Sequence, residues 1–186
     1  LVGSEMCIRD RVNDCSPKPE TIGFLKEIAD TFENIKVVDL ARNGGQANAQ
    51  VAALHYVTGD AVLNMDDDMQ THPSQLPILL EKMKEGYDVV YGQYPYRKNS
   101  FIKNLTSKFN AYTSRVLLGR PKTIVSSNYW VITRMVRNEV IKYTSYNPYV
   151  DAIFYRVTHN IADVPIEHFK REYGSCLLYT SDAADE

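Results

Sequence analysis

Cysteine is scarce in this chain, with three among 186 residues. Cys7 and Cys176 lie close to the two ends, so that only Cys15 stands within the body of the chain. A single cysteine provides neither a disulfide framework nor a cysteine-based metal site, which favours a reducing compartment. The sequence also lacks any run of about 18 apolar residues, the length that a membrane-spanning helix requires. These absences leave a globular domain without disulfides as the expected class.

The two ends of the sequence also lack the features of natural termini. Leu1–Arg11 has no initiating methionine and no apolar stretch of a signal peptide. This segment and Cys176–Glu186 resemble in-frame translations of a sequencing adaptor, so we expect two non-native tails around a domain of residues 12–175, with both native ends missing. The alternative is that both segments are natural tails. Without them, 19 basic and 18 acidic residues remain, a balance that does not favour nucleic-acid binding.

Acidic residues are absent from the whole stretch between Asp88 and Glu139. Such segregation of charge indicates an anionic partner, either a phosphate group or the surface of an anionic bilayer. An amphipathic helix predicted over Asn99–Leu118 is then expected to lie against the membrane interface. The alternative is a solvated basic face on a helix that packs on the core. The cations of the stretch are Arg97, Lys98, Lys103, Lys108, Arg115, Arg120, Lys122, Arg134 and Arg137.

Apolar runs typical of strands alternate with helical patterns along the domain. This order predicts an α/β fold of three layers, α/β/α, with a mostly parallel central sheet. Ligands of such sheets bind outside the carboxyl ends of the strands, which directs attention to the loops after Val12 and after Met65. The predicted strands are Ile35–Leu40, Ala61–Met65, Asp88–Tyr91, Asn128–Thr133 and Ile161–Phe169. The other predicted helices are Thr21–Thr31, Gly45–Val57, Ser74–Glu85, Arg134–Tyr143 and Pro148–Asn160.

Three consecutive carboxylates, Asp66, Asp67 and Asp68, follow the apolar run that ends at Met65. Adjacent like charges repel each other, and a divalent cation such as Mg²⁺ or Mn²⁺, which prefers oxygen ligands and bridges phosphates, offsets that repulsion. In an extended chain Asp66 and Asp68 point to one side and Asp67 to the other. We therefore predict Asp68 as a metal ligand and Asp66 as a ligand of the metal or of a ribose. The alternative is a solvated acidic turn.

Three motifs in order resemble signatures of the family 2 glycosyltransferases. They are Val12-Asn13-Asp14-Cys15-Ser16-Pro17, Arg42-Asn43-Gly44-Gly45-Gln46 and Met65-Asp66-Asp67-Asp68-Met69-Gln70. The resemblance covers nearly all of residues 12–175 and is closest to the branch that acts on polyprenyl and dolichyl phosphates. It implies a GT-A fold, a Rossmann-like nucleotide-binding sheet whose first strand is missing here. The family's common V-D-D-G-S is here Val12-Asn13-Asp14-Cys15-Ser16, with an amide in place of the first carboxylate.

The resemblance also implies roles for individual residues. Asp14 matches the residue that recognises the base or ribose of the donor. His168-Phe169-Lys170-Arg171-Glu172-Tyr173-Gly174-Ser175 resembles the family's H-x-x-R-x-x-G-x-S element, with His168 as a further metal or diphosphate contact and Arg171 as a diphosphate anchor. The other donor-binding residues are Asn43, Gly44, Gln46, Asp66, Asp67 and Gln70, and the residues that correspond to acceptor-phosphate contacts are Arg97, Ser107 and Asn110.

The implied reaction is an inverting transfer of a sugar from a nucleoside diphosphate sugar, assisted by Mg²⁺ or Mn²⁺. The acceptor is expected to be a polyprenyl phosphate on the cytoplasmic side of a membrane, and the alternative is a hydroxyl of a glycan. Asp68 and Arg171 are expected to stabilise the departing diphosphate. Asp151 is a candidate base or acceptor-orienting group, or else simply a carboxylate favoured at a helix N-terminus. Two rival functions stay open, a nucleotidyltransferase and a non-catalytic nucleotide-sugar-binding domain.

Overall fold

The computed structural model describes residues 9–66, 71–94, 121, 123–167 and 169. Within them the elements follow the predicted alternation of strands and helices. The strands are β1 (Arg9–Asn13), β2 (Ile35–Asp39), β3 (Ala61–Asn64), β4 (Val89–Gln93), β5 (Trp130–Thr133) and β6 (Ile161–Pro165). The helices are α1 (Pro19–Thr31), α2 (Gln46–Tyr56), α3 (Leu76–Lys84) with a preceding 3₁₀ turn η1 (Pro73–Gln75), α5 (Arg134–Val140) and α6 (Val150–Val157). The helix predicted over Asn99–Leu118 lies outside the described residues.

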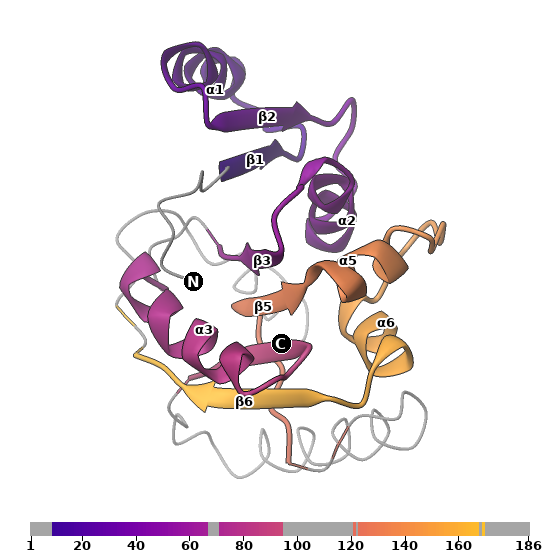
Figure 1. The fold of residues 1–186 in the computed structure, drawn as a ribbon. Helices are drawn as coiled ribbons and strands as arrows, with labels where there is room; N and C mark the ends of the chain where they lie inside the picture. Colours follow the sequence, from indigo (N-terminus) through magenta and orange to yellow (C-terminus); the bar gives the residue numbers. More distant parts are fainter. Residues whose placement is uncertain (1–8, 67–70, 95–120, 122, 168, 170–186) are drawn as a thin grey trace, which may run out of the picture.

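The strands form two sheets rather than one (Figure 1). β1 and β2 pair in parallel, and β3, β5, β4 and β6 form a second sheet in that order. The predicted α/β class is confirmed, but the larger sheet is mixed rather than mostly parallel, because β5 runs antiparallel to β3 and β4. A short helical crossover imposes parallel pairing, whereas the long connection from β4 to β5 leaves the direction of β5 open.

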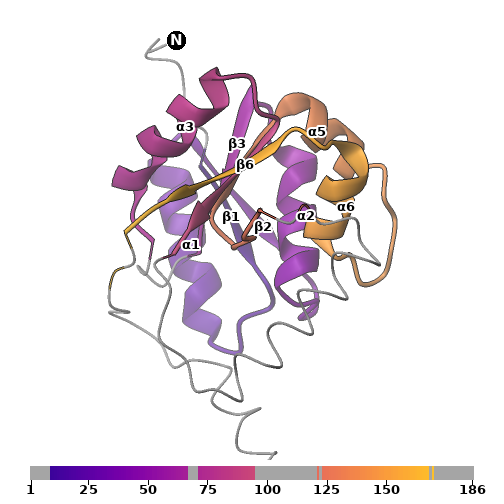
Figure 2. The same ribbon diagram turned by 90° about the horizontal axis from the view of Figure 1, so that it is seen from below.

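The core surrounds the four-stranded sheet on both faces. Side chains alternate along a strand, so Val89 and Tyr91 of β4 face one cluster and Val90 faces the other. The first cluster includes side chains of α2, α5 and α6, and the second includes Leu79 of α3. The predicted three-layer arrangement is therefore built around this sheet, with α3 on one face and α5 and α6 on the other (Figure 2).

Gly92 shows how tightly the second cluster is packed. A Cβ atom at this position would lie 2.6 Å from Cδ1 of Ile166 and 2.8 Å from Cδ1 of Tyr129. Glycine in a strand often marks such a close approach of side chains from neighbouring elements. β4 therefore packs closely only because position 92 carries no side chain.

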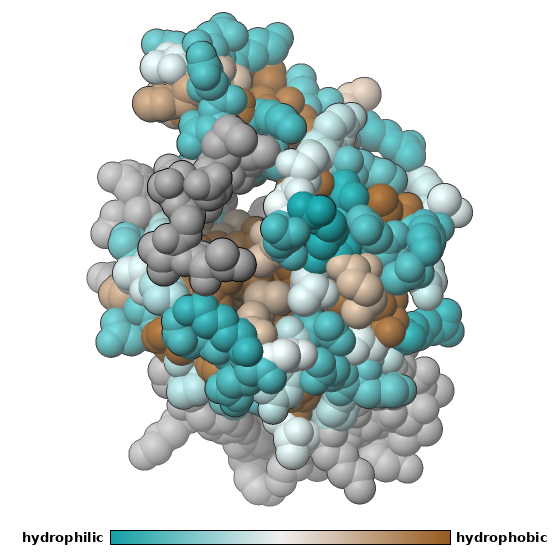
Figure 3. Space-filling model, viewed as in Figure 1, coloured by the Kyte–Doolittle hydropathy of each residue, from teal (hydrophilic) through white to brown (hydrophobic). Residues whose placement is uncertain are grey.

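The unit formed by α1, β1 and β2 is much less buried. No residue of α1 or β2 is buried, and Phe24 and Phe32 are 63% and 52% exposed. Figure 3 shows a hollow between this unit and the rest of the molecule, with apolar surface visible inside it. Among the helices of the described residues, none combines the length and apolar character needed to cross a bilayer.

Residues 9–11, which the sequence analysis assigned to a non-native tail, form the first part of β1. Backbone groups pair in a parallel ladder whatever side chains they carry, and this strand aligns Asp10 with Lys36 of β2. Asp10 fits the position poorly, because both carboxylate oxygens are shielded from solvent and have no hydrogen-bond partner in the described part of the chain. The domain limits, and the expectation that a preceding strand is missing, stay predictions.

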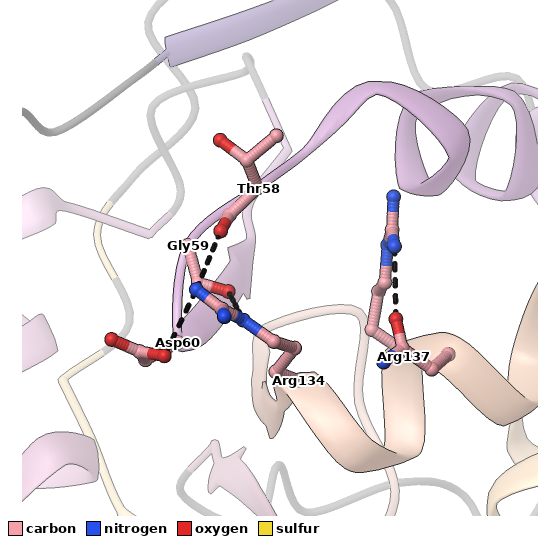
Figure 4. Close-up of polar contacts among 6 residues, drawn as sticks. Thr58, Gly59, Asp60, Arg134 and Arg137 are labelled. Carbon is pink, nitrogen blue, oxygen red and sulfur yellow. Dashed lines mark hydrogen bonds and ion pairs between the residues drawn. The ribbon is translucent and has the colours of Figure 1, made fainter.

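Two arginines of α5 hold the connection between α2 and β3. The guanidinium of Arg137 donates to the carbonyl oxygens of Leu54 (2.7 Å) and His55 (3.1 Å) at the end of α2. Arg134 donates to the carbonyl oxygens of Thr58 and Gly59 and forms an exposed ion pair with Asp60 (Figure 4). Both arginines were counted among the cations expected to face an anionic partner. The structure instead assigns them to the α2–β3 connection.

Candidate active site

The loop after β1 has a backbone conformation that explains its motif. Cys15 has φ +53°, in the left-handed region that glycine adopts without strain. It occupies the position of the glycine in the family's V-D-D-G-S pattern. Asn13, which replaces the first aspartate of that pattern, donates to Oδ1 of Asp39 (2.7 Å) and accepts from the N–H of Ser16 (3.1 Å). The amide therefore fixes the end of β1 to the end of β2.

Asp14 organises the loop that precedes α2. Its Oδ1 accepts from the N–H of Gly44 (2.7 Å) and its Oδ2 from the N–H of Gly45 (2.9 Å), while its carbonyl oxygen accepts from Asn43 (3.1 Å). Gly45 has φ +82°, again a conformation suited to glycine. Because α2 begins at Gln46 without a side-chain cap of its own, the carboxylate of Asp14 supplies the negative charge that a helix N-terminus favours.

Asp66 lies two residues beyond the carboxyl end of β3 and is bound from α2. Its Oδ1 accepts from Nε2 of Gln46 at 2.7 Å. The segment from Gly44 to Gln46 thus joins Asp14, which follows β1, to Asp66, which follows β3. Five of the predicted donor-binding residues, Asp14, Asn43, Gly44, Gln46 and Asp66, are brought together in this way. The carboxyl ends of β1 and β3, which belong to different sheets, thus lie near the same loop, and the carboxyl ends of strands are where α/β folds bind ligands.

Eight of the predicted site residues lie outside the described residues, and the structure gives no account of them. Within the described part, no three His, Cys, Asp or Glu side chains gather into a metal-binding group. The donor set nevertheless fits Mg²⁺ or Mn²⁺, because Asp66 presents hard carboxylate oxygens at a strand end and the sequence adds two more carboxylates directly after it. The eight residues are Asp67, Asp68, Gln70, Arg97, Ser107, Asn110, His168 and Arg171.

Asp151 contacts a buried tyrosine of the protein core. It lies in the first turn of α6, where the helix dipole favours a carboxylate, and its Oδ1 accepts from the hydroxyl of Tyr91 at 2.8 Å. Burial, together with the negative charge of Asp151, raises the pKa of Tyr91 well above its usual value. The tyrosine therefore stays protonated as a donor. These contacts agree with the alternative that Asp151 is a carboxylate favoured at a helix N-terminus. Its role as a base stays a prediction.

A cavity of about 570 Å³ lies beside the Asp14 loop. Asn48 of α2 spans it, since Nδ2 donates to the carbonyl oxygens of Gly44 (2.7 Å) and Tyr146 (3.2 Å), and the guanidinium of Arg42 lies 5.5 Å from the centre of the Tyr146 ring. Tyr146 is not among the predicted site residues, because no local pattern links it to a loop about 100 residues earlier. The cavity is lined by Leu40, Ala41, Arg42, Asn43, Gly44, Asn48, Ser145, Tyr146 and Asn147.

An α/β domain that gathers carboxylates and a glycine loop at one sheet edge belongs to the class of folds that bind ligands there. The chain matches the model of the family described as Glycosyl transferase family 2 over residues 11–144 and belongs to this family. Membership favours the predicted glycosyltransferase over the nucleotidyltransferase alternative. The assignment to the polyprenyl-phosphate branch stays a prediction.

Solved structures share this fold. Glucosyl-3-phosphoglycerate synthase from Mycobacterium tuberculosis, in complex with phosphoglyceric acid, matches with a TM-score of 0.58 and 19% identity over 88% of this chain and 60% of that chain. The same enzyme with Mn²⁺ and uridine-diphosphate-glucose matches with a TM-score of 0.57 and 17% identity over 91% of this chain and 61% of that one. S. aureus TarS 1–349 gives 0.52 and 17%, over 83% and 48%. The chain thus spans about three fifths of the synthase, and these identities show the fold alone.

Proposed function

We propose that this chain is the donor-binding catalytic domain of a glycosyltransferase that transfers a sugar from a nucleoside diphosphate sugar with the help of Mg²⁺ or Mn²⁺. The observation that carries the proposal is the Gly44–Gln46 segment, which binds Asp14 at one end and Asp66 at the other. This arrangement places carboxylates from the ends of two strands around one loop. The synthase that shares the fold was solved with Mn²⁺ and uridine-diphosphate-glucose, which supports the proposed ligand class.

In this proposal, Asp66 and Asp68 hold the cation, with His168 as a further contact. A bound cation neutralises the negative charge that develops on the departing diphosphate. Asp14 binds the loop before α2 and so holds Gln46 in place beside Asp66. Arg171 anchors the diphosphate, since a planar guanidinium suits phosphate oxygens. The reaction is a single displacement with inversion at the sugar carbon.

The proposed acceptor is a polyprenyl phosphate at the cytoplasmic side of a membrane. Its support is the long stretch between Asp88 and Glu139 that carries cations and no carboxylate. Arg97, Ser107 and Asn110 are the proposed contacts to the acceptor phosphate. A phosphate is already ionised at neutral pH, so this acceptor needs no base. A glycan hydroxyl is the alternative acceptor and requires one, for which Asp151 is the candidate.

The test is a transfer assay with Mn²⁺ and a set of nucleoside diphosphate sugars, with polyprenyl phosphate or a glycan as acceptor. Asp66→Asn is expected to lower kcat/KM by about 100-fold or more, because stabilisation of the developing charge is lost. Glu81→Gln, which removes an exposed carboxylate of α3 paired with Lys84, is the matched control and should leave the rate unchanged. Equal rates for the Asp66 variant and the parent would refute the proposed site. Transfer to the glycan alone would refute the proposed acceptor.

A further inference from the structure

A chain of contacts made by three amide side chains ends on Asp66. Asn64 of β3 donates to the backbone carbonyl oxygen of Asn128, and the side chain of Asn128 lies with Nδ2 as a donor 3.4 Å from Oε1 of Gln46. Gln46 in turn donates from Nε2 to Oδ1 of Asp66 at 2.7 Å. The chain links three separate parts of the structure, namely β3, the residues just before β5 and the first residue of α2. Gln46 and Asn128 are 82 residues apart in sequence.

The direction of these bonds sets the orientation of the Gln46 amide. An amide has a donor end and an acceptor end, so the two can serve only complementary partners. Because Asn128 donates to Oε1, the Nε2 end of Gln46 is turned toward the carboxylate of Asp66. The opposite orientation would place Oε1 against a carboxylate oxygen, which is repulsive. Asn128 is thus linked to Asp66 through Gln46.

The bonds lie near the surface, so they contribute little to the stability of the fold. The Gln46–Asp66 and Asn128–Gln46 bonds both join exposed groups. A hydrogen bond between exposed groups adds little to folding, because water replaces the partner when the bond is lost. Partners that orient a metal-binding carboxylate have a larger effect on the metal, because removing one typically lowers metal affinity or activity about 10- to 100-fold.

We propose that Asn128 is a positioning residue, which acts through Gln46 to orient the Asp66 carboxylate toward a divalent cation. This inference rests on the proposed function, since it takes Asp66 as a cation ligand. It extends the site to a segment that the motifs do not include and gives Gln46 a specific task beyond lining a nucleotide pocket. The predicted consequence is a change in cation affinity with little change in stability.

The test measures Mn²⁺ binding by the 186-residue chain, from the electron paramagnetic resonance signal of the free aqua ion, with and without uridine diphosphate. Asn128→Ala and Gln46→Ala are each expected to raise the Kd for Mn²⁺ about 10-fold or more. Because the two residues act in series, the double variant should be no weaker than Gln46→Ala alone. Asn138→Ala, which removes an exposed amide of α5, is the matched control and should bind like the parent.

The outcomes separate the two proposals. If the parent does not bind Mn²⁺, both the cation site and the positioning role are overturned. If the parent binds and Asn128→Ala binds equally well, or if the two substitutions add fully, the positioning role alone is overturned. Thermal unfolding of each variant completes the experiment. A Tm for Asn128→Ala that equals the parent's, together with weaker Mn²⁺ binding, supports orientation of Asp66 over a structural role.

Discussion

Two carboxylates near β1 differ in the hydrogen-bond partners that the fold gives them. Asp14 is satisfied by two backbone N–H groups at 2.7 and 2.9 Å. Asp10, only four residues earlier, has shielded oxygens with no hydrogen-bond partner among the described residues. A buried charge without hydrogen bonds costs free energy, and the group responds by holding its proton more tightly. Asp10 is thus a residue of the described part at which pH should act on the stability of this fold.

Burial raises the pKa of Asp10, and the opposing effect of Lys36 is smaller. A carboxyl whose pKa is raised on folding stabilises the folded state in its protonated form. That contribution is complete below the ordinary pKa of aspartate and is lost as the pH rises through the raised pKa. We therefore expect Asp10→Asn to be more stable than the parent at neutral pH, with a difference that shrinks on acidification.

Urea unfolding of the parent and of Asp10→Asn, measured from neutral pH down to below the ordinary pKa of aspartate, checks the expectation. Asp30→Asn, which changes an exposed carboxylate of α1, is the control for a general loss of negative charge. A difference between the Asp10 variant and the parent that does not change with pH would contradict the prediction.

At the scale of elements, α5 stabilises the end of α2 by donating hydrogen bonds to its last carbonyl groups. These groups have no partner within their own helix, and the dipole of α2 favours a cation beside them. Arg137 is half-buried and reaches two of them, at Leu54 and His55. The same contact joins α2, which carries Gln46 at its other end, to α5, which directly follows β5 of the four-stranded sheet. α5 thereby supports the candidate site from a distance.

Arg137→Ala is expected to lower the free energy of unfolding by about 1.5–3 kcal/mol, the range for hydrogen bonds to charged groups. Arg137→Lys should recover only part of the loss, because one ammonium group does not reproduce the planar fork of donors. Lys142→Met serves as the control, since it removes an exposed ion pair with Glu139 and should cost less than about 1 kcal/mol. Chemical denaturation measures all three. A loss for Arg137→Ala no larger than for the control would show that the contact is dispensable.

At the scale of the whole molecule, burial divides the protein into two parts of unequal stability. Val89, Val90 and Tyr91 of β4 are completely buried, whereas β2 and α1 contain no buried residue. Regions with few buried apolar contacts open at a lower free energy than the core. The unit of α1, β1 and β2 should therefore open locally while the four-stranded sheet stays folded. Asp14 follows β1, so the candidate site lies at the boundary between the two parts.

Hydrogen–deuterium exchange tests this division. Amides of β2 and α1 are expected to exchange about 10- to 100-fold faster than those of β4, in conditions where exchange reports the opening equilibrium. Addition of Mn²⁺ and uridine diphosphate should slow exchange in the less stable unit, because a ligand that binds the closed form stabilises it. Equal protection of β2 and β4 would show instead that the two sheets open as one cooperative unit.

Much of this architecture follows from local patterns in the sequence. The predicted helix over Gly45–Val57 is found as α2 at Gln46–Tyr56, and the predicted strand Asp88–Tyr91 as β4 at Val89–Gln93. The apolar run ahead of Asp66 correctly placed that carboxylate just after a strand. In the structure Asn43 donates to the carbonyl oxygen of Asp14, while the donor-binding roles of Asn43, Gln46 and Asp14 stay predictions. Such features are local, because hydrophobic period, glycine conformation and strand length act over a few residues.

Contacts between residues far apart in the chain were decided by the tertiary structure alone. The antiparallel course of β5, the contact of Asn128 with Gln46 and that of Tyr146 with Asn48 join residues that are far apart in the chain. The arginines of α5 were likewise predicted to face an anionic partner, yet they bind carbonyl groups about 80 residues away in the sequence. Closing such long loops depends on how the whole core packs, and no short pattern encodes it. Local patterns thus place the candidate site residues near strand ends, and packing decides which distant side chains contact them.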